Sequence, residues 1–132
     1  MKTFQVSVID GQLKVECSGL LDAPVVAALL TETKSALEGR ADVTQVLVVT
    51  NAVTDCTEAA KKELVALQRE LSANGRRSAW LDERARFRGI ALWVMHLAGD
   101  THGKAVSTVE QALRWLSSNE VREEQGRKVV SA

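Results

Sequence analysis

The segment from Val46 to Leu67 constrains the fold of this chain more than any other. It begins with an unbroken apolar run, Val46-Leu47-Val48-Val49, passes through a short polar turn, and then opens an amphipathic helix. A run that is apolar on both faces is typical of a strand in the middle of a covered sheet. The helix must therefore start beyond the carboxyl end of a central strand, where open α/β sheets usually carry their functional groups.

Hydrophobic periodicity divides the rest of the chain into alternating strands and helices. Asp10-Gly11 is a hairpin signal between two strands with period-2 alternation, the second of which breaks at Gly19–Asp22. Asp22 and Pro24 then predict a helix start. Strands are predicted at 3–9, 13–17, 45–50, 78–82 and 104–106, and helices at 22–39, 56–74, 83–98 and 107–116.

This order predicts an α/β fold, a single domain with a mixed, mostly parallel sheet and about four packing helices. We expect the domain to span residues 1–118 and a polar, mobile tail to span residues 119–132. In the strand at 78–82, Ala79 and Leu81 are expected on one side of the sheet and Trp80 on the other.

The bulk composition excludes several classes of function. The 132 residues favour one domain, and 45% apolar residues suffice for a core without metal or disulfides. The 17 basic and 17 acidic residues give no reason to expect nucleic acid or an anionic membrane as partner, and no apolar run is long enough to span a bilayer. Two cysteines without paired spacing, and no signal peptide, favour a cytoplasmic location.

The polar turn Asp55-Cys56-Thr57-Glu58 has two compatible interpretations. As a capping box, Asp55 would cap the helix and Glu58 would reach back to the backbone. As a functional loop, it would present hydroxyl and carboxylate groups at a helix N-terminus, where the helix dipole favours anions. Cys56 is either a thiolate stabilised by that dipole or a small residue without a reactive role, and the second interpretation is preferred.

Four local sequence patterns, taken in their order along the chain, match those of one protein family. They are Gly19-Leu20-Leu21-Asp22-Ala23 before the first helix, Asp55-Cys56-Thr57 after the central strand, Asn74-Gly75 after the long helix, and the closing Val109–Leu116. Together they resemble the STAS domains, and among these the stand-alone anti-sigma-factor antagonists of bacteria. The resemblance covers residues 3–118 in element order and size.

The resemblance implies a non-enzymatic signalling protein that binds a protein partner, either a serine/threonine kinase or an anti-sigma factor. It implies that the kinase phosphorylates Thr57 and that the phosphate breaks the complex. The partner-binding residues would be Asp55, Cys56, Thr57, Glu58 and Lys61. The chain departs from the family pattern at Asn51, Cys56 and Glu58, and a carboxylate at Glu58 would repel a phosphate on its neighbour.

Two other functions remain open. One is a constitutive scaffold or assembly module in which Cys56 and Glu58 have replaced the phosphorylation switch at Thr57. The other is a small-ligand or lipid-binding protein, which requires an apolar pocket next to Ala52–Val53. No nucleophile–base motif, phosphate loop or zinc spacing is present, and His96, His102 and Asp100 are too few for a metal site, so we expect no enzyme, metal or cofactor.

Two further groups of side chains bear on partners. Trp93 and Trp115 lie off the predicted inner stripes of their helices, so they either anchor an interface or pack between helices, and packing is preferred. Five arginines cluster around the start of the third helix, and they predict a solvated face or, alternatively, a surface for an acidic partner or a neighbouring subunit. They are Arg76, Arg77, Arg84, Arg86 and Arg88.

Overall fold

A five-stranded sheet with the strand order β1-β2-β3-β4-β5 forms the frame of the molecule. The computed structural model describes residues 3–121. The strands β1 and β2 pair antiparallel and the other neighbours pair parallel, so the predicted mixed, mostly parallel sheet is confirmed. The elements are β1 (Phe4–Ile9), β2 (Gln12–Leu21), α1 (Ala23–Leu37), β3 (Gln45–Cys56), α2 (Glu58–Ser72), a 3-10 turn (Ala73–Gly75), β4 (Arg77–Leu81), α3 (Ala85–Leu97), β5 (Gly103–Val106) and α4 (Val109–Leu116).

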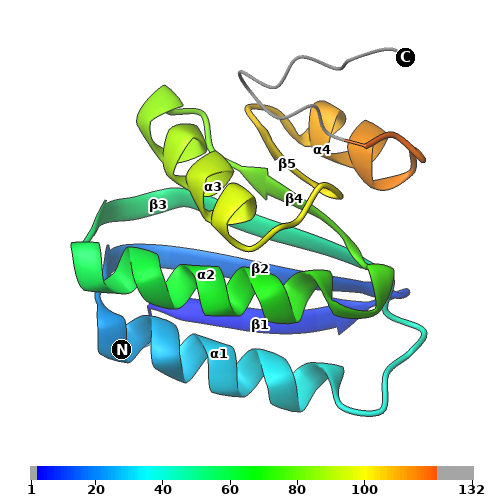
Figure 1. Cartoon of the computed structure of the whole chain (residues 1–132), viewed down its shortest axis with the longest axis horizontal. Coiled ribbons are helices and arrows are strands. Elements are labelled where there is room, and N and C mark those ends of the chain that lie inside the picture. Colours follow the sequence, from blue (N-terminus) through cyan, green and yellow to red (C-terminus); the bar gives the residue numbers. More distant parts are fainter. Residues whose placement is uncertain (1–2, 122–132) are drawn as a thin grey trace.

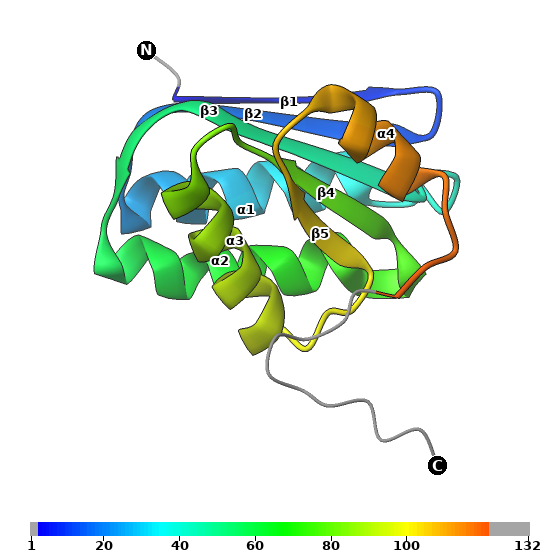
Figure 2. The same cartoon turned by 90° about the horizontal axis from the view of Figure 1, so that it is seen from above.

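The helices cover both faces of the sheet. The helices α1, α2 and α3 lie on one face over the larger core, and α4 lies on the other (Figure 1, Figure 2). Val46 and Val48 of β3 face the larger core and Leu47 faces α4, which explains why this strand is apolar on both faces. The prediction for 78–82 is also confirmed, because Trp80 joins the larger core while Ala79 and Leu81 join the smaller one. Within residues 3–121, no helix is both long and apolar enough to cross a membrane.

For α4 the sequence predicts a capping box that begins at Ser107 and an apolar stripe of Val109, Ala112, Leu113 and Leu116, and both predictions are partly wrong. Its N-cap is Thr108 and not Ser107, and the Thr108 hydroxyl accepts a hydrogen bond from the backbone N–H of Gln111. Trp115 is buried and its Nε1 donates to the carbonyl of His102 at 3.1 Å, whereas Leu113 is exposed. The sheet-facing stripe is therefore Ala112, Trp115 and Leu116, and the expected stripe residue Val109 is also exposed.

The strands β2 and β3 are both longer than the sequence predicts. Instead of stopping at Gly19 and Thr50, they continue side by side to Leu21 and Cys56. Two register shifts accommodate this extension, and Gly19 lies there at φ +71°, a backbone conformation that favours glycine. The pairing satisfies the backbone groups of a polar segment that would otherwise be a loop.

A buried hydrogen-bond network fixes α2 against the β4 side of the sheet. Gln68 is fully buried, and its Nε2 donates to Asp100 Oδ2 at 2.6 Å and to Ser78 Oγ at 2.9 Å. Its Oε1 accepts from Trp80 Nε1 at 2.8 Å. The amide nitrogen and the amide oxygen of Gln68 are thus both hydrogen-bonded. A buried polar group in such a network specifies one position for the helix.

The segment after α4 is tied to the sheet. Arg77 Nη2 donates to Ser118 Oγ at 2.9 Å and to the carbonyl of Glu120 at 2.6 Å. Residues 122–132 of the predicted tail lie outside the described residues, so the mobility of the tail and the boundary at residue 118 stay predictions.

Candidate functional site

The candidate site is the junction between β3 and α2, where the sequence places Asp55, Cys56, Thr57 and Glu58. The N-cap of α2 is Thr57, whose Oγ1 accepts a hydrogen bond from the Ala60 N–H at 3.1 Å. The capping box predicted with Asp55 as the cap is therefore wrong, because β3 extends to Cys56 and the helix begins two residues later. Asp55 instead accepts a hydrogen bond from the Cys56 N–H at 2.8 Å.

Two ion pairs surround Thr57. Lys61 Nζ lies 2.7 Å from Glu58 Oε1, and Arg86 Nη2 lies 3.0 Å from Asp55 Oδ1. Both carboxylates are exposed, and Thr57 is half-buried between them along the chain. The Cys56 N–H and the Arg86 guanidinium lower the pKa of Asp55, and the Lys61 hydrogen bond lowers the pKa of Glu58. The four charges sum to zero, so the site presents two fixed carboxylates without a net local charge.

Cys56 is not an activated thiol. Its side chain is buried, its Sγ contacts the Thr57 carbonyl at 3.8 Å, and burial raises its pKa. The other thiol, Cys17, is buried in the same core, where burial raises its pKa to about 12. A buried neutral thiol behaves as a small apolar residue, so the thiolate interpretation of Cys56 is wrong.

Arg84 supports the site from the loop between β4 and α3. Its Nη1 donates to the carbonyl of Val53 at 2.7 Å, and its Nη2 donates to the carbonyl of Thr50 at 2.8 Å. The same guanidinium forms a forked pair with Asp82, with Nε–Oδ1 and Nη2–Oδ2 distances of 2.9 Å. We call Thr50, Asp82 and Arg84 the arginine clamp, because they hold the extension of β3 in one position.

The arginine clamp is closed by two further hydrogen bonds. The Thr50 hydroxyl donates to Asp82 Oδ2 at 2.8 Å, and Asn51 Oδ1 accepts from the Glu83 N–H at 2.8 Å. Burial alone would raise the pKa of Asp82, but the hydrogen bonds from Arg84 and Thr50 bring it below the usual value. The predicted solvated arginine face is therefore partly wrong, since Arg84 is half-buried and Arg76 is buried, while Arg86 is exposed.

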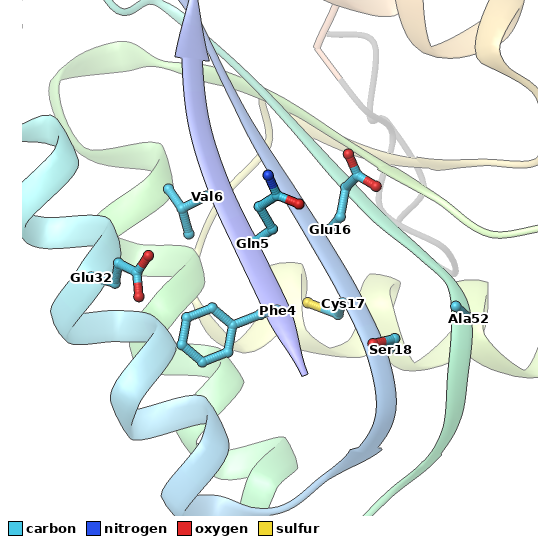
Figure 3. Close-up of a pocket in the computed structure, with 8 residues that line it drawn as sticks. All are labelled: Phe4, Gln5, Val6, Glu16, Cys17, Ser18, Glu32 and Ala52. Atoms are coloured by element: carbon cyan, nitrogen blue, oxygen red, sulfur yellow. The ribbon is translucent and has the colours of Figure 1, made fainter. Parts of the chain in front are cut away.

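An open pocket lies beside edge strand β1, and Thr57 is not among its lining residues (Figure 3). The pocket has a volume of about 550 Å³ and reaches Ala52. The lipid-binding alternative requires an apolar pocket at this place. Half of its lining residues are polar or charged, including Glu16 and Glu32. Sites for apolar ligands are lined mainly by apolar side chains, so the lining does not support the lipid-binding alternative. Over residues 3–121, no three His, Cys, Asp or Glu side chains gather as metal ligands.

Comparison with known proteins identifies the fold. No family model and no curated protein matches this sequence. The anti-sigma factor antagonist SpoIIAA in its unphosphorylated form is similar in structure, with a TM-score of 0.61, 16% identity, and 82% of this chain and 91% of that chain covered. An anti-sigma factor antagonist from Mycobacterium paratuberculosis gives a TM-score of 0.63 at 20% identity, covering 88% and 94%. A variant of RsbS from Moorella thermoacetica gives a TM-score of 0.64 at 15% identity, with 86% of this chain and 93% of that chain covered. The chain therefore has a STAS-like fold, as the sequence resemblance predicts.

Proposed function

We propose that this chain is a STAS-type signalling module that binds a protein partner, a serine/threonine kinase or an anti-sigma factor, in the bacterial cytoplasm. The docking surface is the β3–α2 junction with Asp55, Thr57, Glu58 and Lys61, while buried Cys56 supports it from beneath. The observation that carries the proposal is the arginine clamp, because Arg84 fixes the backbone behind the two exposed carboxylates. A surface that is already ordered loses little conformational entropy when a partner binds.

Thr57 is the residue proposed for regulation. Its hydroxyl lies at the N-cap of α2, where unpaired backbone N–H groups and the helix dipole favour an anion. A phosphate there would add a charge of about −1.5 to −2 to a cluster whose own charges cancel. The docking surface would become strongly negative, and a partner that fits the neutral surface would be released. SpoIIAA, which has a similar fold, is known in unphosphorylated and phosphorylated forms.

A constitutive docking module is the second candidate. Lys61 and Arg86 are the cations beside Thr57 in the described structure, and each is already paired with a carboxylate of the chain. Glu58 therefore supplies a permanent negative charge next to the helix N-terminus, where a phosphate would otherwise act. In this form of the proposal the same surface binds the same kind of partner without a switch.

Affinity capture with a charge-reversed loop tests the docking surface. The bait is the full chain carrying Glu58→Lys, compared with the wild type and with Glu110→Lys in the first turn of α4, a matched exposed glutamate. We expect a native-host protein that the wild type and Glu110→Lys retain and that Glu58→Lys loses. A partner that binds all three baits equally would contradict docking at the β3–α2 junction.

Mass spectrometric site mapping of the chain from its native host separates the switch from the constitutive module. Phosphate on Thr57 supports the switch, and an unmodified Thr57 across growth and stress conditions supports the constitutive module. Thr57→Asn is the informative variant, because asparagine caps helices about as well as threonine but carries no hydroxyl. The switch predicts that Thr57→Asn binds the partner in cells permanently, whereas the constitutive module predicts no change.

A further inference from the structure

The edge strand β1 leaves a row of main-chain groups unpaired. The Ser18 N–H donates to the carbonyl of Thr3 at 2.7 Å, and β1 and β2 keep one register along the whole of β1. Hydrogen-bonded and non-hydrogen-bonded pairs alternate in an antiparallel ladder, so the N–H and C=O groups of Phe4, Val6 and Val8 point away from β2. Among the hydrogen bonds of residues 3–121, none uses these outward groups.

The strand β1 also lacks the features that protect the edges of natural sheets. Edge strands are commonly short, charged, interrupted by proline or bent by a β-bulge. The other edge strand, β5, has four residues and carries Lys104. In contrast, β1 has six residues, Phe4-Gln5-Val6-Ser7-Val8-Ile9, with neither a charge nor a proline, and its pairing with β2 has no register shift. The edge of β1 is therefore open to a further strand.

The pocket of about 550 Å³ lies along this open edge. Successive side chains of a strand point to opposite faces of the sheet, yet the consecutive residues Phe4, Gln5 and Val6 all line the pocket. A hollow bordered by all three lies beside the strand and not over one face. Figure 3 shows Phe4, Val6 and Glu32 of α1 on one side of β1, and Gln5 and Glu16 on the other. A chain laid along the edge would meet apolar side chains of β1 on the α1 side and polar side chains on the opposite side.

We propose that the edge of β1 binds an extended segment of a partner protein, which adds to the sheet as a sixth strand. Unpaired N–H and C=O groups at alternate residues select the backbone of an extended chain, and the two sides of the edge select alternating apolar and polar side chains. This edge shares no residue with the β3–α2 docking surface, so the inference does not depend on the proposed function.

The helix α1 excludes a second copy of this chain as the occupant. It lies over β1 on the side of the larger core (Figure 1, Figure 2). A two-fold axis between two antiparallel β1 strands would place both α1 helices on the same face, about 5 Å apart like the strands beneath them. Packed helices need about 8–10 Å between their axes. The occupant must therefore carry no helix over the added strand, a condition that an isolated extended segment meets.

Binding of a synthetic peptide to the full chain tests the proposal. The probe has the sequence of residues 3–9, Thr-Phe-Gln-Val-Ser-Val-Ile, which has the required alternation and carries no helix. Two modified peptides are N-methylated at the odd or at the even positions, because only one of these sets can donate to β1. We expect one modified peptide to bind like the unmodified probe and the other at least tenfold more weakly. Equal binding of both, or no binding of the unmodified probe, would overturn the proposal.

Amide hydrogen exchange locates the peptide on the chain. In the free chain the odd-numbered amides of β1 should exchange more slowly than those of Phe4, Val6 and Val8, because only the odd-numbered amides donate to β2. The bound peptide should protect Phe4, Val6 and Val8. Protection of these three amides in the chain alone would mean that a segment of this chain or a second copy fills the edge, and it would overturn the proposal. A bound peptide that leaves them unprotected would do the same.

A proline variant tests the edge from the side of the protein. Val6→Pro removes one outward N–H and leaves the donors of the β1–β2 ladder in place, since proline is tolerated on the free side of an edge strand. It should bind the unmodified peptide at least tenfold more weakly than the wild type. Wild-type affinity in Val6→Pro would contradict pairing along this edge. If Val6→Pro does not fold, the two N-methylated peptides decide with the unaltered chain.

Discussion

Replacing Arg84 with methionine should destabilise the protein and loosen the candidate site. Methionine keeps an unbranched apolar stem but removes the guanidinium, whose carbon lies 3.8 Å from the centroid of the Phe87 ring. The substitution also removes four hydrogen bonds to Thr50, Val53 and Asp82. Removing one partner of a buried ion pair costs about 3–5 kcal/mol. The Arg84 side chain is 39% exposed, so water replaces part of what is lost, and we expect about 2 kcal/mol.

Urea denaturation measures this loss directly. A change of about 2 kcal/mol corresponds to a drop of about 1 M in the urea midpoint for a domain of this size. Arg86→Met is the matched control, because Arg86 is exposed and pairs with exposed Asp55, so its midpoint should stay close to that of the wild type. Hydrogen exchange of amides 51–57 should also accelerate in Arg84→Met alone. An unchanged midpoint and unchanged exchange in Arg84→Met would refute the clamp.

The same clamp predicts a defined pH dependence. The pKa of Asp82 is lower in the folded chain than its usual value, so its contribution to stability is present at neutral pH. That contribution is lost as the pH falls below the unfolded value of about 3.9 and through the folded pKa. Asp82→Asn should remove this part of the acid sensitivity, which urea unfolding at neutral and acidic pH measures. If the free energy of unfolding falls equally on acidification in Asp82→Asn and in the wild type, the role given to Asp82 is contradicted.

Four other perturbations have expected outcomes of their own. Gly103→Ala should cost about 1–3 kcal/mol in urea unfolding, because the new Cβ would lie 2.7 Å from an Asp100 oxygen, whereas Gly89→Ala in the open interior of α3 should stabilise by about 0.5–1 kcal/mol. Thr33→Val should raise stability by about 1 kcal/mol, since the buried Thr33 hydroxyl has no hydrogen-bond partner, and an unchanged or lower midpoint would contradict this. The two cysteines should react with iodoacetamide at pH 8 only after unfolding, because burial raises both pKa values.

The fold could be predicted from the sequence because its decisive signals are local. The apolar run of β3 identifies a strand covered on both faces, and Asp22 does cap α1 by accepting from the Val25 N–H at 3.0 Å. The error at the start of α2 has a specific cause. Asp55 and Thr57 are both good caps, and only the pairing of β2 with the end of β3 decides between them.

The clamp could not be found from the sequence because its members are distant along the chain. Thr50 and Asp82 lie 32 residues apart, and the hydrogen bond between them depends on the neighbouring positions of β3 and β4. Alternating arginines at 84, 86 and 88 gave a weak signal, and a solvated surface explains such a pattern equally well. Trp115 lies on the sheet-facing side of α4 with Ala112 and Leu116, whereas the apolar residues Val109 and Leu113 had favoured the neighbouring side of the helix.

Chemical-shift mapping by NMR is the most direct test of docking at the β3–α2 junction. The isotopically labelled chain of 132 residues is titrated with the purified protein captured by the wild-type bait. We predict that the largest amide shifts fall on residues 53–61. Shifts centred on β5 and α4, with residues 53–61 unaffected, would contradict the account.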